Sequence, residues 1–138
     1  EITIPIGTAE IKKEGKDVSL IAHGRCVIVA LEAAKKLEEE SGINAEVVDL
    51  RSIRPLDEET ILKSVAKTNR VVLVDESKPF CGISSQIATM IQEKAFDDLD
   101  APIKRVTSVD APAIYSPPVE KEQIPNVSRI VDMVQSLG

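Results

Sequence analysis

The chain has 138 residues, of which 43% are apolar and only 2% aromatic, so it is long enough for one domain with an aliphatic core. Such a composition offers almost no stacking surface for bases, and the formal net charge of −6 argues against nucleic acid or an anionic membrane as a partner. The same charge would suit a basic protein. No apolar run approaches the roughly 20 residues of a membrane span, and two cysteines are too few for a disulfide framework.

The first residues have the character of a connection rather than of a core element. The stretch Thr3–Gly7 is typical of an extended segment, and the chain starts at Glu1 rather than at a methionine. We therefore expect residues 1–7 to be a linker from a missing N-terminal domain, and residues 8–138 to form the domain itself.

Two strands and a helix are expected next. The strands should cover residues 8–13, which the turn Glu14–Lys16 ends, and residues 17–22. From Cys26 onward, apolar side chains recur with helical spacing. Gly42 can end that helix as a left-handed cap.

A strand–helix–strand unit in the middle of the chain organises the rest. It opens with the apolar run Val47–Leu50, after which Pro55 prevents a helix from starting any earlier and Asp57 can cap the helix that follows. Asn69 can close that helix, and residues 71–74 form a second apolar run with no alternation. A strand that is apolar on both faces, joined to its neighbour by one helix, is typical of a parallel sheet buried between helical layers.

The last third of the chain continues the alternation. Apolar spacing predicts a helix from Ile83 to Ile91, and residues 103–109 predict a fifth strand. Residues 110–122 hold three prolines and should be an irregular loop. Pro125 is expected to open a final amphipathic helix.

These elements predict an α/β fold in three αβα layers, with about five mostly parallel strands, one antiparallel edge strand and four helices. Right-handed crossovers from a central strand would place later strands on both sides of it. Ligands in such sheets bind beyond the carboxyl ends of the strands, where the strand order reverses. The polar residues expected at that edge are His23, Arg25, Asp75, Glu76 and Lys78.

The polar group at this edge supports two interpretations. His23 could act as a general acid or base with Glu76 orienting it. Alternatively, these are exposed loop residues and His23 is hydrogen-bonded locally, which is the simpler reading because fold geometry alone nominates the site. The chain has no glycine-rich phosphate loop, since Gly24 stands alone and Gly82 follows the wrong strand.

The residues also argue against two other kinds of site. A phosphoacceptor domain would need an acidic pair after the first parallel strand, where this chain has His23 and Gly24. Cys26 could be a nucleophile with a pKa lowered by its place at a helix start, but a small buried apolar side chain is the simpler role. The residues by themselves therefore predict no convincing active site.

Several segments resemble the C-terminal, transketolase-like domain of the beta subunit of 2-oxo acid dehydrogenases, and most closely that of pyruvate dehydrogenase. The resemblance rests on residues 46–57 and 64–70, on Leu99–Pro102 with Arg105–Thr107, and on Ile124–Pro125. It covers essentially the whole chain, in order and spacing.

The resemblance implies an intact enzyme that is an α2β2 heterotetramer and uses thiamine diphosphate and magnesium to decarboxylate a 2-oxo acid and acylate lipoamide. In that family the cofactor lies between the alpha chain and the beta chain's N-terminal domain, so no catalytic, cofactor or metal residue is expected in this segment, which should be inactive alone. The C-terminal domain assembles subunits and helps to dock the dihydrolipoyl acyltransferase through its subunit-binding domain. Asp100, with the C-terminal Gly138 nearby, would carry that docking.

Alternatives remain open at this point. The same domain occurs in branched-chain 2-oxo acid and acetoin dehydrogenases and in transketolase-like synthases, and substrate pockets lie outside this segment. A small-ligand regulatory domain that uses the His23 and Glu76 edge is the other alternative. The resemblance implies a bacterial cytoplasm or a mitochondrial matrix as the compartment.

Overall fold

The sheet of this protein has five strands in the order β1-β3-β2-β4-β5. A computed structural model describes residues 8–51, 56–76, 82–108 and 125–137. The strands are β1 (Glu10–Lys13), β2 (Val18–Ala22), β3 (Ala45–Asp49), β4 (Val71–Val74) and β5 (Lys104–Val106). Strand β1 pairs antiparallel with β3 at one edge, and the other three pairings are parallel. The predicted mostly parallel sheet with one antiparallel edge strand is thereby confirmed.

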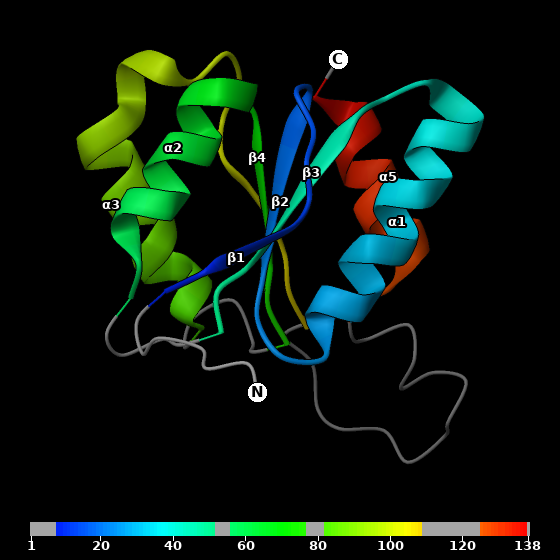
Figure 1. Cartoon of the computed structure of the whole chain (residues 1–138), viewed down its shortest axis with the longest axis horizontal. Coiled ribbons are helices and arrows are strands. Elements are labelled where there is room, and N and C mark those ends of the chain that lie inside the picture. Colours follow the sequence, from blue (N-terminus) through cyan, green and yellow to red (C-terminus); the bar gives the residue numbers. More distant parts are fainter. Residues whose placement is uncertain (1–7, 52–55, 77–81, 109–124, 138) are drawn as a thin grey trace, which may run out of the picture.

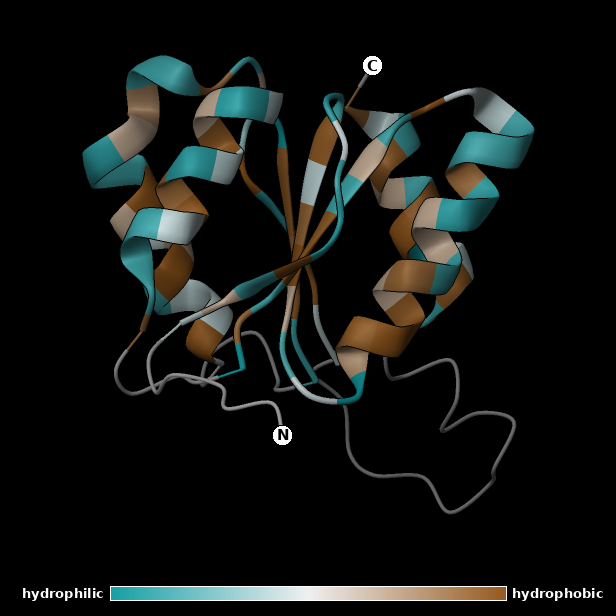
Figure 2. Ribbon diagram, viewed as in Figure 1, coloured by the Kyte–Doolittle hydropathy of each residue, from teal (hydrophilic) through white to brown (hydrophobic). Residues whose placement is uncertain are grey.

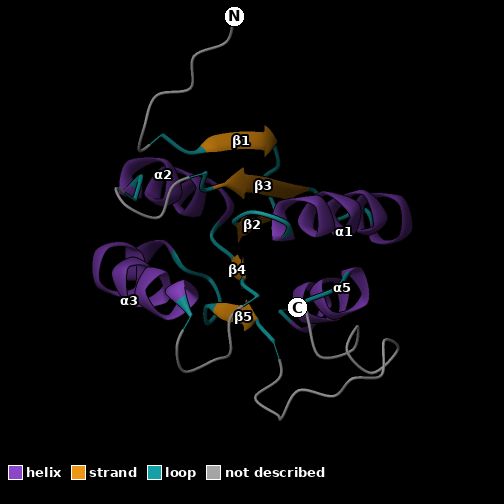
Figure 3. Cartoon of the chain, turned by 90° about the horizontal axis from the view of Figure 1, so that it is seen from below, coloured by secondary structure: helices purple, strands orange, loops and turns teal. Residues whose placement is uncertain are grey.

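Helices cover both faces of this sheet, which gives the predicted three layers (Figure 1 and Figure 3). The described helices are α1 (Cys26–Ser41), α2 (Glu58–Thr68), α3 (Ile83–Ala95), the short 3-10 helix η1 (Phe96–Asp98) and α5 (Val127–Ser136). Helices α1 and α5 pack on one face, and α2 and α3 pack on the other (Figure 3). No described helix is long and apolar enough to cross a membrane.

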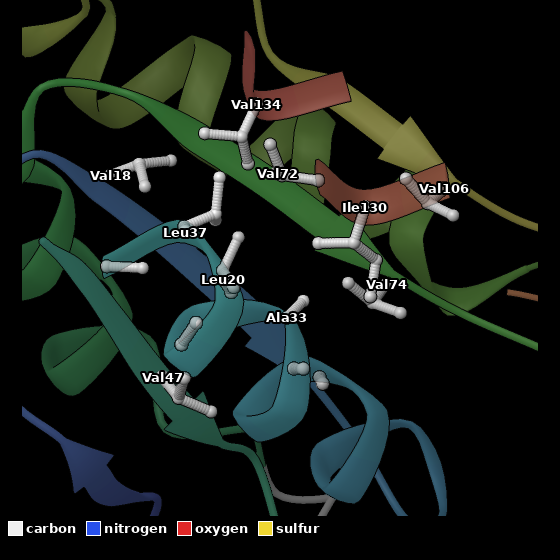
Figure 4. Packing of buried hydrophobic residues seen from close by; sticks show 14 of the residues in the cluster. Val18, Leu20, Ala33, Leu37, Val47, Val72, Val74, Val106, Ile130 and Val134 are labelled. Atoms are coloured by element: carbon white, nitrogen blue, oxygen red, sulfur yellow. The ribbon is translucent and has the colours of Figure 1, made fainter. Parts of the chain in front are cut away.

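Strand β4 shows how one apolar run serves two cores. Val72 and Val74 belong to the cluster under α1 and α5, whereas Val71 and Leu73 belong to the cluster under α2 and α3. All four are at most 3% exposed, as the absence of alternation predicts for a central parallel strand. Figure 4 shows the first cluster, and Figure 2 shows the apolar helix faces turned toward the sheet.

The predicted helix ends are confirmed where the chain supplies a cap. Asp57 accepts a hydrogen bond from the Thr60 N–H at 3.1 Å and so caps α2, and Asn69 closes that helix with φ +64°. Gly42 closes α1 in the left-handed conformation, at φ +66°. At α5 the prediction needs a small correction: Asn126, not Pro125, is the capping residue, because its side chain can accept the Arg129 N–H at 2.9 Å.

Most predicted boundaries lie within a few residues of the observed ones. The edge strand starts at Glu10 rather than at residue 8, and the helix from Ile83 continues to Ala95. The fifth strand covers only Lys104–Val106. The loop predicted over residues 110–122 lies outside the described residues.

A buried polar cluster joins β2, β3 and α2 near the amino ends of the strands. Glu46, only 2% exposed, accepts hydrogen bonds from the Ser64 hydroxyl at 2.6 Å, the Lys67 ammonium at 2.7 Å and the Gly15 N–H at 3.2 Å. Burial alone would raise the pKa of Glu46, but these hydrogen bonds lower it overall. A Cβ on Gly15 would lie 2.3 Å from the Ala45 carbonyl carbon, so this position must be glycine.

Candidate functional sites at the two ends of the sheet

The carboxyl ends of the parallel strands bound a hollow of about 440 Å³, which we call the carboxyl-end hollow. It lies where β2 is flanked by β3 on one side and β4 on the other, the point at which the strand order reverses. Its lining residues are Ile21, His23, Gly24, Arg25, Leu50, Leu73, Val74, Asp75, Glu76, Ile83, Ser84 and Ile87. Four of the five polar residues expected at this edge thus come together, and the fifth, Lys78, lies outside the described residues.

Three charged side chains of this hollow, Arg25, Asp75 and Glu76, make hydrogen bonds within the domain. The Arg25 Nε donates to Glu76 at 2.8 Å, in an ion pair whose side chains are 66% and 44% exposed. Glu76 is thus engaged by Arg25, and its predicted role in orienting His23 stays a prediction. Asp75 accepts the Ser84 N–H at 3.1 Å. Because Gly82, the N-cap of α3, has no side chain to offer, Asp75 does the capping from the end of β4.

Cys26 behaves as a buried apolar side chain and not as a nucleophile. It is 2% exposed, and burial raises the pKa of its thiol to about 11, with the Glu76 and Asp75 carboxylates adding to the rise. The expectation that a helix start would lower this pKa is wrong, because burial and two nearby negative charges outweigh the helix end. A thiol with such a pKa stays protonated near neutral pH.

The described residues of the carboxyl-end hollow offer hydrogen-bonding groups, one ion pair and the His23 imidazole. Among the residues that the structure describes, no group of three or more His, Cys, Asp and Glu side chains is placed to hold a metal ion. The start of α3 already holds the Asp75 carboxylate, and Arg25 already pairs with Glu76. The described residues of this hollow therefore do not fit a diphosphate with its magnesium ion.

The opposite end of the sheet carries a second hollow, of about 520 Å³, which we call the amino-end hollow. Its lining residues are Lys16, Asp17, Val18, Ile43, Thr68, Asn69, Arg70, Asp100, Val134, Gln135 and Leu137. Five separate stretches of the chain contribute to it. Asp100 and Leu137 thus meet in one hollow, although 37 positions separate them in the sequence (137 − 100); Gly138 lies outside the described residues.

Asn69 holds the loop that carries Asp100. The Asp100 N–H donates to the Asn69 carbonyl oxygen at 2.8 Å, and the Asn69 side-chain amide donates to the Asp98 carbonyl oxygen at 2.7 Å. The backbone of this loop is therefore tied to the turn between α2 and β4, while the Asp100 side chain is exposed. From the sequence, Asn69 was recognisable as a helix cap but not as a clamp on a loop about 30 residues away.

The layered architecture and the two strand-end hollows define a doubly wound αβα domain. The profile of the family described as "Transketolase, C-terminal domain" matches residues 7–130, and the chain belongs to this family.

Two curated relatives and one solved structure show how wide this family is. The chain is 49% identical, over 98% of its length, to the beta subunit of acetoin:2,6-dichlorophenolindophenol oxidoreductase of Bacillus subtilis (strain 168), and covers 39% of that protein. It is 48% identical, over 93% of its length, to the mitochondrial pyruvate dehydrogenase E1 component subunit beta-2 of Oryza sativa subsp. japonica, and covers 34% of it. A split-gene transketolase, solved as an inactive β4 tetramer, superimposes with a TM-score of 0.84 at 32% identity, over 99% of this chain and 43% of that one.

Proposed function

We propose that this chain is the assembly and partner-docking domain of the beta subunit of a thiamine diphosphate-dependent 2-oxo acid dehydrogenase, of the pyruvate dehydrogenase type. The domain's family and its relatives support the enzyme class. The observation that carries the docking role is that Asp100 and Leu137 line the same hollow, at the amino end of the sheet. Because Asp100 is exposed and its backbone is tied down, it offers a negative charge on a fixed loop to a basic partner.

The path of the chain supports a docking surface at the amino end of the sheet. Glu10, the first residue of β1, pairs with Asp49, the last residue of β3, so the chain enters the sheet at the carboxyl end. The Ala9 N–H donates to Asp57 at 2.9 Å, which ties this entry to the start of α2. The chain preceding residue 8 would therefore reach the domain at the end of the sheet opposite to Asp100.

The remaining parts of the proposal concern the whole enzyme. The chain spans about a third to two fifths of the length of the curated relatives named above. Decarboxylation of the 2-oxo acid, acylation of lipoamide, and binding of thiamine diphosphate and magnesium would belong to the alpha subunit and to the rest of the beta subunit in an α2β2 assembly. This segment would bind none of these and would be inactive alone. Residues 1–7 would be the linker, and the compartment would be a bacterial cytoplasm or a mitochondrial matrix.

Pyruvate is the substrate we propose, with acetoin and branched-chain 2-oxo acids as the alternatives. The near-equal identities to an acetoin enzyme and to a pyruvate dehydrogenase, 49% and 48%, do not separate these substrates. Turnover of the assembled enzyme on pyruvate, acetoin and 2-oxoisovalerate would decide among them.

The docking role is tested by Asp100→Asn in the reconstituted heterotetramer, which removes the charge and keeps the shape. Binding of the subunit-binding domain of the acyltransferase should weaken about ten-fold, as expected when one charge of a desolvated interface pair is lost, and its salt dependence should flatten. Asp132→Asn, an exposed aspartate in the middle of α5, is the matched control and should change neither quantity. Unchanged affinity and salt slope in Asp100→Asn would reject the docking role.

A second candidate function is a small-ligand regulatory site at the carboxyl-end hollow, with His23, Arg25, Glu76 and, in the adjoining segment, Lys78. The observation that favours it is the Ser84 hydroxyl, which lies in a 2% exposed residue of the hollow's lining and has no hydrogen-bond partner within the described residues. A thermal-shift screen with 2-oxo acids, nucleotides and acyl-coenzyme A tests it. A compound that stabilises the domain, and does so less in Ser84→Ala, would support this function; no shift with any compound would reject it.

A further inference from the structure

Two large apolar side chains are conspicuously exposed among the described residues. Ile28 is 63% exposed and Phe96 is 60% exposed. Ile28 lies in the first turn of α1, near the carboxyl end of the sheet, whereas Phe96 begins η1, directly after α3, at the amino end (Figure 1). Single exposed apolar residues are common, so the surroundings of each decide whether it has a role.

The chain around Phe96 is fixed in place. The Leu99 N–H donates to the Phe96 carbonyl oxygen at 3.1 Å, and Leu99 itself packs against the core under α2 and α3. Asn69 then holds the next part of the loop through Asp98 and Asp100. Because the backbone is anchored on both sides, Phe96 is presented to solvent by a rigid support, and little conformational freedom would be lost when a partner covers it.

The charges beside Phe96 indicate what kind of partner would cover it. Asp97, Asp98 and Asp100 follow within four positions, all are exposed, and the whole chain carries a net charge of −6. Protein interfaces commonly place an aromatic anchor at a centre that excludes water and charged pairs toward the rim. Residues 96–100 supply both kinds of exposed side chain within five consecutive positions.

We infer that Phe96 is the apolar anchor of the docking surface, and that the partner is a small basic domain that places an aliphatic or aromatic side chain on this ring beside a cation facing Asp100. This inference rests on the proposed docking function. Apolar contact with the Phe96 ring would contribute to the affinity for the partner, in addition to the charge on Asp100. Excluding water around the ring would also strengthen the neighbouring ion pair, because a charge pair is stronger where water is displaced.

Phe96→Ala in the assembled heterotetramer tests the inference, with the subunit-binding domain of the acyltransferase as the probe. We expect the affinity to fall about ten-fold or more, as for an aromatic anchor, while the salt slope stays unchanged because no charge is removed. Ile28→Ala is the matched control, since it removes an equally exposed apolar side chain at the other end of the sheet and should leave binding unchanged. Phe96→Leu should recover most of the affinity.

The outcomes separate this inference from the function on which it rests. Loss of affinity in Asp100→Asn but not in Phe96→Ala would overturn the role of Phe96 and leave docking at Asp100 intact. Loss in neither variant would overturn both. The inference would also be overturned if Phe96→Ala changed the oligomeric state of the enzyme in the absence of the subunit-binding domain. Phe96 would then lie between copies of this chain. Equal melting temperatures of the two alanine variants and the parent exclude a folding defect as the cause.

Discussion

The two ends of the sheet contrast in how their polar groups are used. At the carboxyl end, Arg25 pairs with Glu76 and Asp75 accepts the Ser84 N–H, so these charged groups are bonded within the domain. At the amino end, backbone hydrogen bonds through Asn69 hold the loop while the Asp100 side chain is left exposed. A polar side chain that is hydrogen-bonded within the domain stabilises the structure. An exposed charge on a fixed loop is available to a partner. Proximity to a strand end is therefore a weaker guide to function than the partners of each side chain.

Each end of the sheet contains a carboxylate that accepts several hydrogen bonds, but the partners of the two carboxylates differ. Near the amino end, Glu46 is buried in a cluster with Ser64 and Lys67. Near the carboxyl end, Asp57 caps α2 and accepts the Ala9 N–H. Hydrogen bonds lower the pKa of both groups below the ordinary value, against the effect of burial. Substitution of each carboxylate measures its contribution to stability separately.

The largest effect is expected from the strand between the two ends. Leu73 is 1% exposed in the core under α2 and α3 and also lines the carboxyl-end hollow. Leu73→Ala should lower the free energy of unfolding by about 2–5 kcal/mol, because it removes buried methyl groups and leaves a cavity. Chemical denaturation measures this, with Ile28→Ala as an exposed control expected within about 0.5 kcal/mol of the parent. A loss below about 1 kcal/mol for Leu73→Ala would mean that the side chain is not part of the core.

Glu46→Gln should have the next largest effect, about 2 kcal/mol, because buried donors on Ser64 and Gly15 lose a charged acceptor. The pH dependence has a definite sign. Since the folded-state pKa of Glu46 lies below its ordinary value of 4.5, its stabilisation is present above that value and is lost as the pH falls through the folded-state pKa. Denaturation curves between neutral and acidic pH should therefore converge for the parent and Glu46→Gln. A difference that persists at low pH would show that the ionised carboxylate is not responsible.

Asp57→Ala should cost about 1 kcal/mol, the usual value for a lost N-cap. It also removes the acceptor for the Ala9 N–H, so hydrogen exchange at Ala9 should accelerate while exchange at the amino end stays as in the parent. Asp57→Asn should retain most of the stability, because the amide oxygen can still accept the Thr60 N–H. Faster exchange around Asn69 in Asp57→Ala would show that the two ends do not unfold independently.

The sequence predicted the parts of this molecule that depend on local patterns. Apolar spacing located the strands and helices, and Asp57, Asn69 and Gly42 were identified as caps because the residue type itself favours the cap conformation. The carboxyl-end group was also predicted, because parallel strands bring their ends to one edge. The amino-end hollow was not, since five separate stretches contribute to it. The burial of Glu46 was not predicted either, because it depends on partners from α2 and from the turn at Gly15.

The smallest effect on stability is expected from Glu76→Gln, because the ion pair with Arg25 is largely exposed and such pairs contribute about 0.5 kcal/mol or less. The substitution has a sharper readout in Cys26. Burial is the main reason that the pKa of this thiol is raised to about 11, and Glu76 contributes through its charge and a hydrogen bond. The pKa should therefore fall in Glu76→Gln but stay above the ordinary 9.0, as measured by the ultraviolet absorbance of the thiolate in a Cys81→Ser background. Asp100→Asn is the control from the other end of the sheet and should leave the Cys26 pKa unchanged. An equal shift in both variants would show that the two ends are electrostatically coupled, and the distinction between a carboxyl end that bonds internally and an amino end that faces a partner would then fail.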